Sequence, residues 1–196
     1  MIVAADEVTR SLSGVWGLLQ RDAAGLRQFD ASQRGLRRSF AAIFLAAPAF
    51  VIALDAERER LGLLLPGTSL TDDPGLILRL LVMFLAAWAL PPLIALLIYR
   101  GETAQSKKSL STFTVASNWS AVLAAFFVAM PAYMLARGLA TPALTAFYLI
   151  AFGVLIAHMR WFTARLALGV SGTSAACLIG TDMGLEMALG HLLALT

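Results

Sequence analysis

The chain has little charge and almost no cysteine for its length. Only 14% of its 196 residues are charged and 59% are apolar, whereas an average soluble domain is about 25% charged and about 45–50% apolar. This balance excludes a water-soluble enzyme, a disordered chain and a nucleic-acid-binding domain, so we expect no nucleic-acid partner. The one cysteine, Cys177, excludes a disulfide framework and a cysteine-based zinc site.

The sequence motifs of catalysis and cofactor binding are also absent. There is no G-x-x-x-x-G-K-[ST] phosphate loop, no G-x-G-x-x-G fingerprint, no H-E-x-x-H and no G-x-S-x-G. The two histidines form no pair that could hold a haem. We therefore expect a protein that is not an enzyme and that binds no cofactor and no metal.

Long apolar runs dominate what is present. A helix needs about 20 apolar residues to cross a bilayer, and a chain within lipid must pair its backbone groups internally. The sequence predicts an all-α, polytopic integral membrane protein in which residues 1–38 form a cytoplasmic arm and residues 39–196 form a five-helix membrane domain. The five spans are expected at about 39–54, 76–99, 113–136, 143–162 and 169–195.

The distribution of basic residues predicts the orientation. With five spans, eleven of the fifteen lysines and arginines fall on the side of residues 1–38, the loop 100–112 and a turn near 160–168. Basic residues stay on the cytoplasmic side, so the N-terminus is expected in the cytoplasm and the C-terminus in the periplasm. Thirteen of the fifteen are arginine, which favours a GC-rich bacterial source and hence a bacterial inner membrane.

The arm has the pattern of an amphipathic helix that lies on the lipid bilayer. Val15, Leu18 and Leu19 recur at helical spacing beside Trp16, which is typical of an interfacial helix. The arm ends with three arginines that anionic headgroups would attract: Arg34, Arg37 and Arg38. These arginines either only set the orientation or form a dedicated lipid or partner site.

Prolines interrupt three of the expected spans, at Pro48, at the Pro91–Pro92 pair and at Pro131. A proline inside a helix removes one N–H and displaces the carbonyl four residues earlier. Asn118 lies at a similar depth in the third span, so we expect it, or its neighbours Ser117 and Ser120, near the carbonyls freed in the second. It would either satisfy that kinked backbone or line a polar cavity open to the cytoplasm.

Small residues recur every four positions in the last run, and we call them the small-residue stripe: Gly172, Ala176, Gly180, Gly184 and Ala188. Such a stripe lets another helix backbone approach closely. The partner helix belongs either to this chain, which we favour, or to another molecule.

Asp182 and Glu186 lie roughly opposite the stripe, one helical turn apart. A carboxylate within a span costs about 2.5–3.5 kcal/mol to insert, so this pair must face protein or water, hold a proton or meet a cation. The pair has either a structural role or a role in handling protons or cations. His158 lies near the cytoplasmic end of its span, so we do not expect it to meet Asp182.

Two stretches and the overall layout resemble the Yip family of membrane proteins, in particular its bacterial relatives. The stretches are FDASQRGLRRSF, residues 29–40, and RWFTARLALGVSG, residues 160–172. The resemblance implies a cytoplasmic arm followed by five closely spaced membrane helices. It carries over no catalytic residue.

The predicted function is that of a non-enzymatic accessory, scaffold or membrane-organising subunit. Its partners would be the lipid bilayer and other membrane-protein subunits or a second copy of the chain. The alternative is a small transporter or an ion or proton channel that uses Asp182 and Glu186, with Asn118 as a further polar group.

Overall fold

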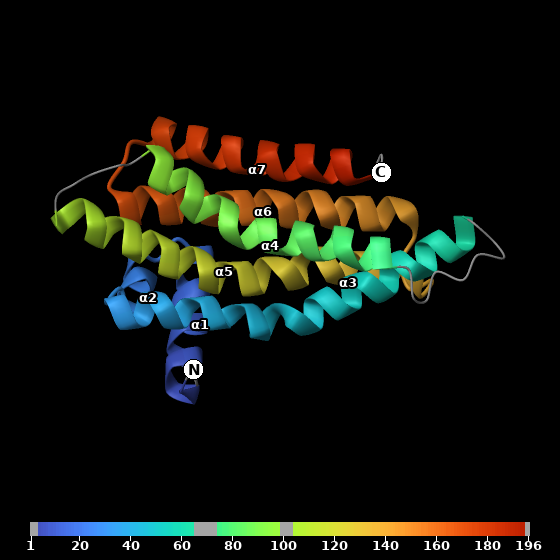
Figure 1. Ribbon diagram of the computed structural model, residues 1–196, viewed down its shortest axis with the longest axis horizontal. Coiled ribbons are helices and arrows are strands. Elements are labelled where there is room, and N and C mark those ends of the chain that lie inside the picture. The colour runs from blue at the N-terminus through green and yellow to red at the C-terminus, as the bar shows by residue number, and fades with distance from the viewer. Residues whose placement is uncertain (1–3, 65–73, 99–103, 195–196) are drawn as a thin grey trace.

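The computed structural model describes residues 4–64, 74–98 and 104–194, and within these ranges every regular element is a helix. Several short helices lie in the N-terminal part of the chain, and the long helices that follow lie side by side (Figure 1). The elements are α1 (Ala5–Leu19), η1 (Ala23–Gln28), α2 (Gln33–Ser39), η2 (Phe40–Ala42), α3 (Ile43–Leu64), α4 (Pro74–Ile98), α5 (Ala104–Ala136), α6 (Pro142–Leu168) and α7 (Gly172–Ala194). The all-helical fold is confirmed.

Four helical segments among the described residues are long and apolar enough to cross a membrane. They are Gln33–Leu61, Pro74–Ile98, Lys107–Ala136 and Pro142–Leu168. The first joins α2, η2 and α3 into one continuous segment. The chain therefore has the helices of a membrane protein, while α7 carries two carboxylates and is not among the four.

Three of the long helices extend beyond their predicted bounds. One is α5, which begins at Ala104 although the loop was expected to continue to residue 112. The first span was expected to stop at residue 54, but α3 continues to Leu64 because the charged residues after Leu54 are good helix formers. The fourth was expected to end in a turn at 160–168, but α6 continues to Leu168. It ends only at Gly169, whose φ of +68° is a left-handed conformation that favours glycine. Arg160 therefore lies inside α6, and its predicted place in a turn was wrong.

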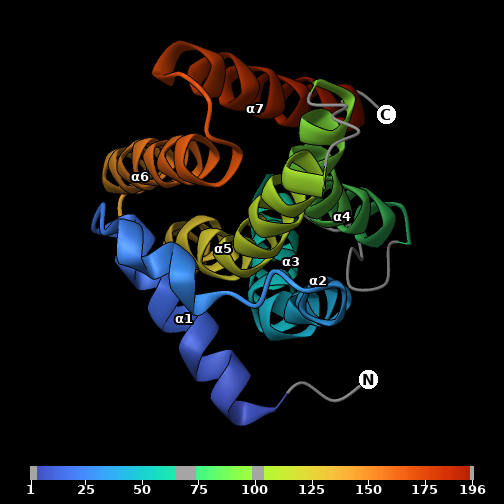
Figure 2. The same cartoon turned by 90° about the vertical axis from the view of Figure 1, so that its left-hand side faces the viewer.

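Helix α5 occupies the centre of the bundle. It packs against α3, α4 and α6, and Figure 2 shows these helices around it, with α7 on the outer side of α6 and α4. Trp119, Val115 and Ala116 of α5 are almost fully buried in the main core. The outward-facing side chains are also largely apolar, with Phe44 and Ile150 about 70% exposed or more. An apolar exterior over an apolar core suits lipid as the surrounding solvent.

The arm packs on the bundle more closely than the sequence predicts. Helix α1 runs across the bundle at one end (Figure 1), and its Val15 and Leu18 side chains are 1% and 0% exposed within the main core. The expected apolar face of an interfacial helix is thus covered by protein, because α5 and α6 lie against it. Trp16 and Leu12 are the large apolar side chains of α1 that stay outside, at 56% and 40% exposed.

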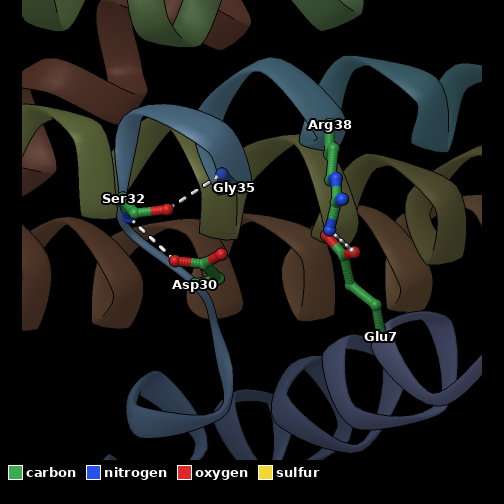
Figure 3. A network of polar contacts seen from close by, with 5 residues as sticks. All are labelled: Glu7, Asp30, Ser32, Gly35 and Arg38. Atoms are coloured by element: carbon green, nitrogen blue, oxygen red, sulfur yellow. Dashed lines mark hydrogen bonds and ion pairs between the residues drawn. The ribbon is translucent and has the colours of Figure 1, made fainter. Parts of the chain in front are cut away.

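A network of polar contacts connects α1 and the residues before α2 to the start of the segment Gln33–Leu61 (Figure 3). Arg38 Nη1 lies 3.1 Å from Glu7 Oε2, which joins α2 to α1. The backbone N–H of Ser32 donates to Asp30 Oδ1 at 2.9 Å, and the Ser32 hydroxyl accepts from the backbone N–H of Gly35 at 3.1 Å. This last bond caps α2, a common role of serine at a helix start.

Candidate functional site

The most highly charged interior site joins α6 to α7, and we call it the Arg160 cluster. Arg160 Nη1 donates to Asp182 Oδ2 at 2.8 Å and to Glu186 Oε1 at 3.0 Å. The exposed fractions of these side chains are 13% for Arg160, 0% for Asp182 and 23% for Glu186. One guanidinium therefore holds two carboxylates inside the bundle.

The turn between α6 and α7 places Arg160 and Asp182 at the same depth in the bundle. Residues 169–171 reverse the chain, and Trp161 Nε1 donates to the Gly172 carbonyl at 2.9 Å across this turn. Arg160 lies about 14 Å of helix rise before the turn, and Asp182 lies about 16 Å after it. Because the rises nearly match, α6 and α7 place both charges at the same depth.

The cluster is short of one positive charge when its three groups are ionised. Arg160 carries one positive charge and the two carboxylates carry two negative charges. Moreover, Asp182 Oδ1 is buried and has no hydrogen-bond partner among the described residues. A buried charge without full compensation is costly, so this site favours a bound proton or a cation.

An apolar cavity of about 330 Å³ lies next to the cluster, between helices α3 to α7. Arg160 and Glu186 are the charged residues of its lining, and Phe50, Phe84 and Trp88 supply aromatic rings. A second cavity of about 230 Å³ adjoins it through shared lining residues, Leu80 and Met83. The second cavity reaches the ends of α3 and α7 that lie away from the arm. Together, the two cavities extend from the cluster toward that end of the bundle.

The structure brings Asp182 and Glu186 together, but it adds a partner that the sequence analysis missed. Arg160 had been counted among the basic residues of a cytoplasmic turn. The signal that could have found it is the absence of glycine and proline between Gly153 and Gly169, which allows α6 to continue through Arg160. Its side chain is then free to point toward the neighbouring helix.

Asn118 belongs to a different place in the bundle. Its Nδ2 donates to Ser39 Oγ at 2.9 Å, and Ser39 Oγ donates to the Leu36 carbonyl at 2.8 Å. The expected approach of Asn118 to the carbonyls before Pro91 was wrong, because this face of α5 packs on the end of α2. Asn118 is 1% exposed, so it couples α5 to the arm and is not part of the Arg160 cluster.

The small-residue stripe of α7 faces away from the other described helices. Ala176, Gly180, Gly184 and Ala188 are exposed, and a Cβ added to Gly180 or Gly184 would meet no atom within 4 Å. Of the three glycines in the stripe, Gly172 is the one whose added Cβ would approach another residue, Trp161, at 3.5 Å. The favoured packing of the stripe within this chain was therefore wrong. The opposite face, with Ala175, Leu178 and Asp182, turns inward.

The three arginines at the end of the arm have different surroundings. Arg34 and Arg37 are exposed on α2, while Arg38 is half-buried beside Glu7. Two guanidinium groups are thus free to meet anionic headgroups, and the third is already paired with a carboxylate.

His158 lies where the arm meets α6. Arg21 Nε donates to His158 Nε2 at 2.8 Å. Arg21 has a φ of +64°, a strained conformation for a residue with a side chain, and this hydrogen bond helps to hold it. His158 is therefore a contact of the arm, and within the described part of the chain it forms no hydrogen bond with the Arg160 cluster.

Comparisons with known proteins return no relative: no family model, no curated protein and no solved structure matches this chain. The resemblance to the Yip family stays a prediction. Within residues 4–64, 74–98 and 104–194, no group of three or more histidine, cysteine, aspartate or glutamate side chains is placed to hold a metal ion.

Proposed function

We propose that this chain is a non-enzymatic bacterial inner-membrane protein that serves as an accessory or scaffold subunit and holds another membrane helix against α7. The observation that carries the proposal is the outward direction of the small-residue stripe. In lipid, helices associate through close backbone packing, and small residues four positions apart allow that approach. No described helix of this chain fills that place.

The direction of the charges on α7 supports its assignment as a fifth span. Both carboxylates point inward to Arg160, and the exposed face of α7 carries no aspartate, glutamate, lysine or arginine. Large apolar side chains such as Met187 and Leu192, 74% and 61% exposed, lie on that outer surface. A lipid-facing surface without charge is what a membrane helix requires.

The proposed topology has a cytoplasmic N-terminus and a periplasmic C-terminus, as in the Yip-like layout. The arm, the start of α5 and the end of α6 lie at one end of the bundle (Figure 1), and they contain nine of the fifteen lysines and arginines. The bias of basic residues toward the cytoplasm supports this orientation, even with Arg160 removed from the count.

A photo-crosslinking side chain placed in native membranes tests the scaffold proposal. We expect Ala176 in the stripe to give a discrete cross-linked product, and Ala151, an exposed alanine on α6, to give none. Gly180→Leu should abolish the product because the added side chain keeps the partner backbone away. Equal products at both positions, or a product unchanged by Gly180→Leu, would contradict the proposal.

The Arg160 cluster favours a second candidate function, a small transporter or an ion or proton channel. Its support is that Arg160 and Glu186 border a cavity, and that this cavity adjoins another toward one end of the bundle. Proteoliposomes should then show a pH-dependent ion flux that Asp182→Asn removes. Proteoliposomes without flux, or a flux that survives this substitution, would exclude transport by this site.

A further inference from the structure

We infer that the apolar cavity beside the Arg160 cluster binds a small amphipathic organic cation, such as an aromatic ring that carries one ammonium group. The positive group would lie against Glu186, and the apolar part would fill the cavity along α4 and α5. This inference concerns binding alone. Binding of the cation without transport would overturn the transporter proposal and would still support this inference.

Charge complementarity defines the sign and number of the ligand's charges. The Arg160 cluster carries a net charge of minus one when ionised. Arg160 and Glu186 both line the cavity, and the excess negative charge comes from Asp182, which is fully buried outside this lining. A single positive charge brings the cluster to neutrality, whereas an anion would add to the excess. Because the surroundings are apolar, an unbalanced charge there costs much more than in water.

The rest of the lining excludes a bare metal ion as the preferred ligand. Hard cations such as Mg²⁺ and Ca²⁺ need about six oxygen ligands, and among the described residues Glu186 supplies the one carboxylate of this lining. The walls consist mainly of alanine, methionine, leucine and aromatic side chains. Apolar walls with a few converging polar groups are typical of sites for small organic molecules.

Three aromatic rings favour a cation over a neutral molecule of the same shape. Phe50 and Phe84 have ring centroids 5.3 Å apart, and the Phe84 and Trp88 rings are 6.5 Å apart. All three line the cavity, and the faces of such rings attract ammonium groups. At about 330 Å³, the cavity lies at the lower end of the usual range for ligand pockets, which suits a molecule of one ring.

Isothermal titration of the full chain in lipid nanodiscs with benzyltrimethylammonium tests this inference. We expect saturable binding by the unchanged chain, weakened at least tenfold by Glu186→Gln, which removes the charge and keeps the shape. Phenylacetate, an anion of similar size, and magnesium chloride should give no saturable heat. An unchanged chain that does not bind the ammonium, or one that binds equally after Glu186→Gln, overturns the inference.

Gly153 offers a second test that leaves the charges intact. It lines the cavity, and a Cβ added there meets no atom within 4 Å, so Gly153→Leu should fill the space without a clash at the backbone. We expect it to weaken binding at least tenfold, while Ala151→Leu, which adds a similar side chain to the exposed face of α6, leaves binding unchanged. Binding that survives Gly153→Leu would place the ligand elsewhere and contradict the inference.

Discussion

Among the described basic residues, Arg137 and Arg160 each pair with two carboxylates, but the Arg160 side chain is 13% exposed and that of Arg137 is 43% exposed. Removing one partner of a buried ion pair leaves the other charge uncompensated, which typically costs about 3–5 kcal/mol. Arg160→Met should therefore lower the free energy of unfolding by about that amount, measured by denaturation in mixed detergent micelles. The triple variant Arg160→Met, Asp182→Asn, Glu186→Gln should recover most of the loss. A triple variant no more stable than the single variant would contradict this account.

Gly35 is a second residue whose identity the structure explains. A Cβ at this position would lie 1.9 Å from the Asp30 carbonyl oxygen, so any side chain must displace the backbone of the arm. Overpacking of this kind costs about 1–3 kcal/mol. We expect Gly35→Ala to speed hydrogen exchange in α2 and the preceding residues. Gly180→Ala is the matched control, since its Cβ meets no atom within 4 Å, and it should leave exchange in the arm unchanged.

Among the helices of the arm, the start of α2 is stabilised by the ionised carboxylate of Asp30. The Ser32 hydroxyl and the Ser32 backbone N–H, which donates at 2.9 Å, lower the pKa of Asp30 below its usual value of 3.8. A carboxyl whose folded pKa is lowered contributes stability above its unfolded pKa, and this contribution is lost as the pH falls through the folded pKa. The protection of α2 amides from hydrogen exchange, taken relative to their intrinsic rate at each pH, should thus be high at pH 5 and should fall below about pH 4.

Asp30→Asn provides the comparison for this pH dependence. It should raise exchange in α2 at pH 5 and reduce the further change on acidification. Asp6→Asn, an exposed carboxyl in the first turn of α1, should keep the wild-type profile. An acid response that is equally strong in the Asp30→Asn variant would show that another group controls it.

Helix α7 shows how far the sequence predicts the site. The helical period places Asp182 and Glu186 on one face and the small-residue stripe on another, and the structure agrees with this division. The sequence does not tell which face turns inward, because that depends on where α4 and α6 lie. Packing of the stripe was expected inside the chain, yet the charged face is the inner one, since Arg160 compensates it.

The predictions for Asn118 and Arg160 were wrong for different reasons. The depth of Asn118 can be counted along its own helix. The sequence does not show which helix Asn118 faces, and in the structure it faces α2 and α3, whereas the prediction placed it against α4. Arg160 was misplaced because the hydropathy pattern ends a span at the first charged residue. The helix continues to Gly169, where the backbone requires a left-handed turn. The number and order of long helices were predictable, whereas the side chains that meet across them were not.

At the scale of the whole molecule, the proposed orientation can be tested with single cysteines in a Cys177→Ala background. Leu139 lies in the α5–α6 turn and is 66% exposed, and Ser171 lies exposed in the α6–α7 turn at the opposite end. A membrane-impermeant thiol reagent added to intact cells should label Leu139→Cys and leave Ser171→Cys unlabelled until the membrane is opened. Equal labelling at both positions, or the reverse order, would contradict the topology.

The pairing of Arg160 with residues on α7 also bears on biogenesis. The guanidinium is synthesised 22 residues before Asp182, and a lone arginine or aspartate is unfavourable in lipid. Neither helix is well suited to leave the translocon by itself, so the two are expected to partition into the bilayer as a hairpin. A chain that ends after α6 would leave the Arg160 guanidinium without its carboxylate partners in the lipid. Membrane quality-control proteases are expected to degrade such a chain.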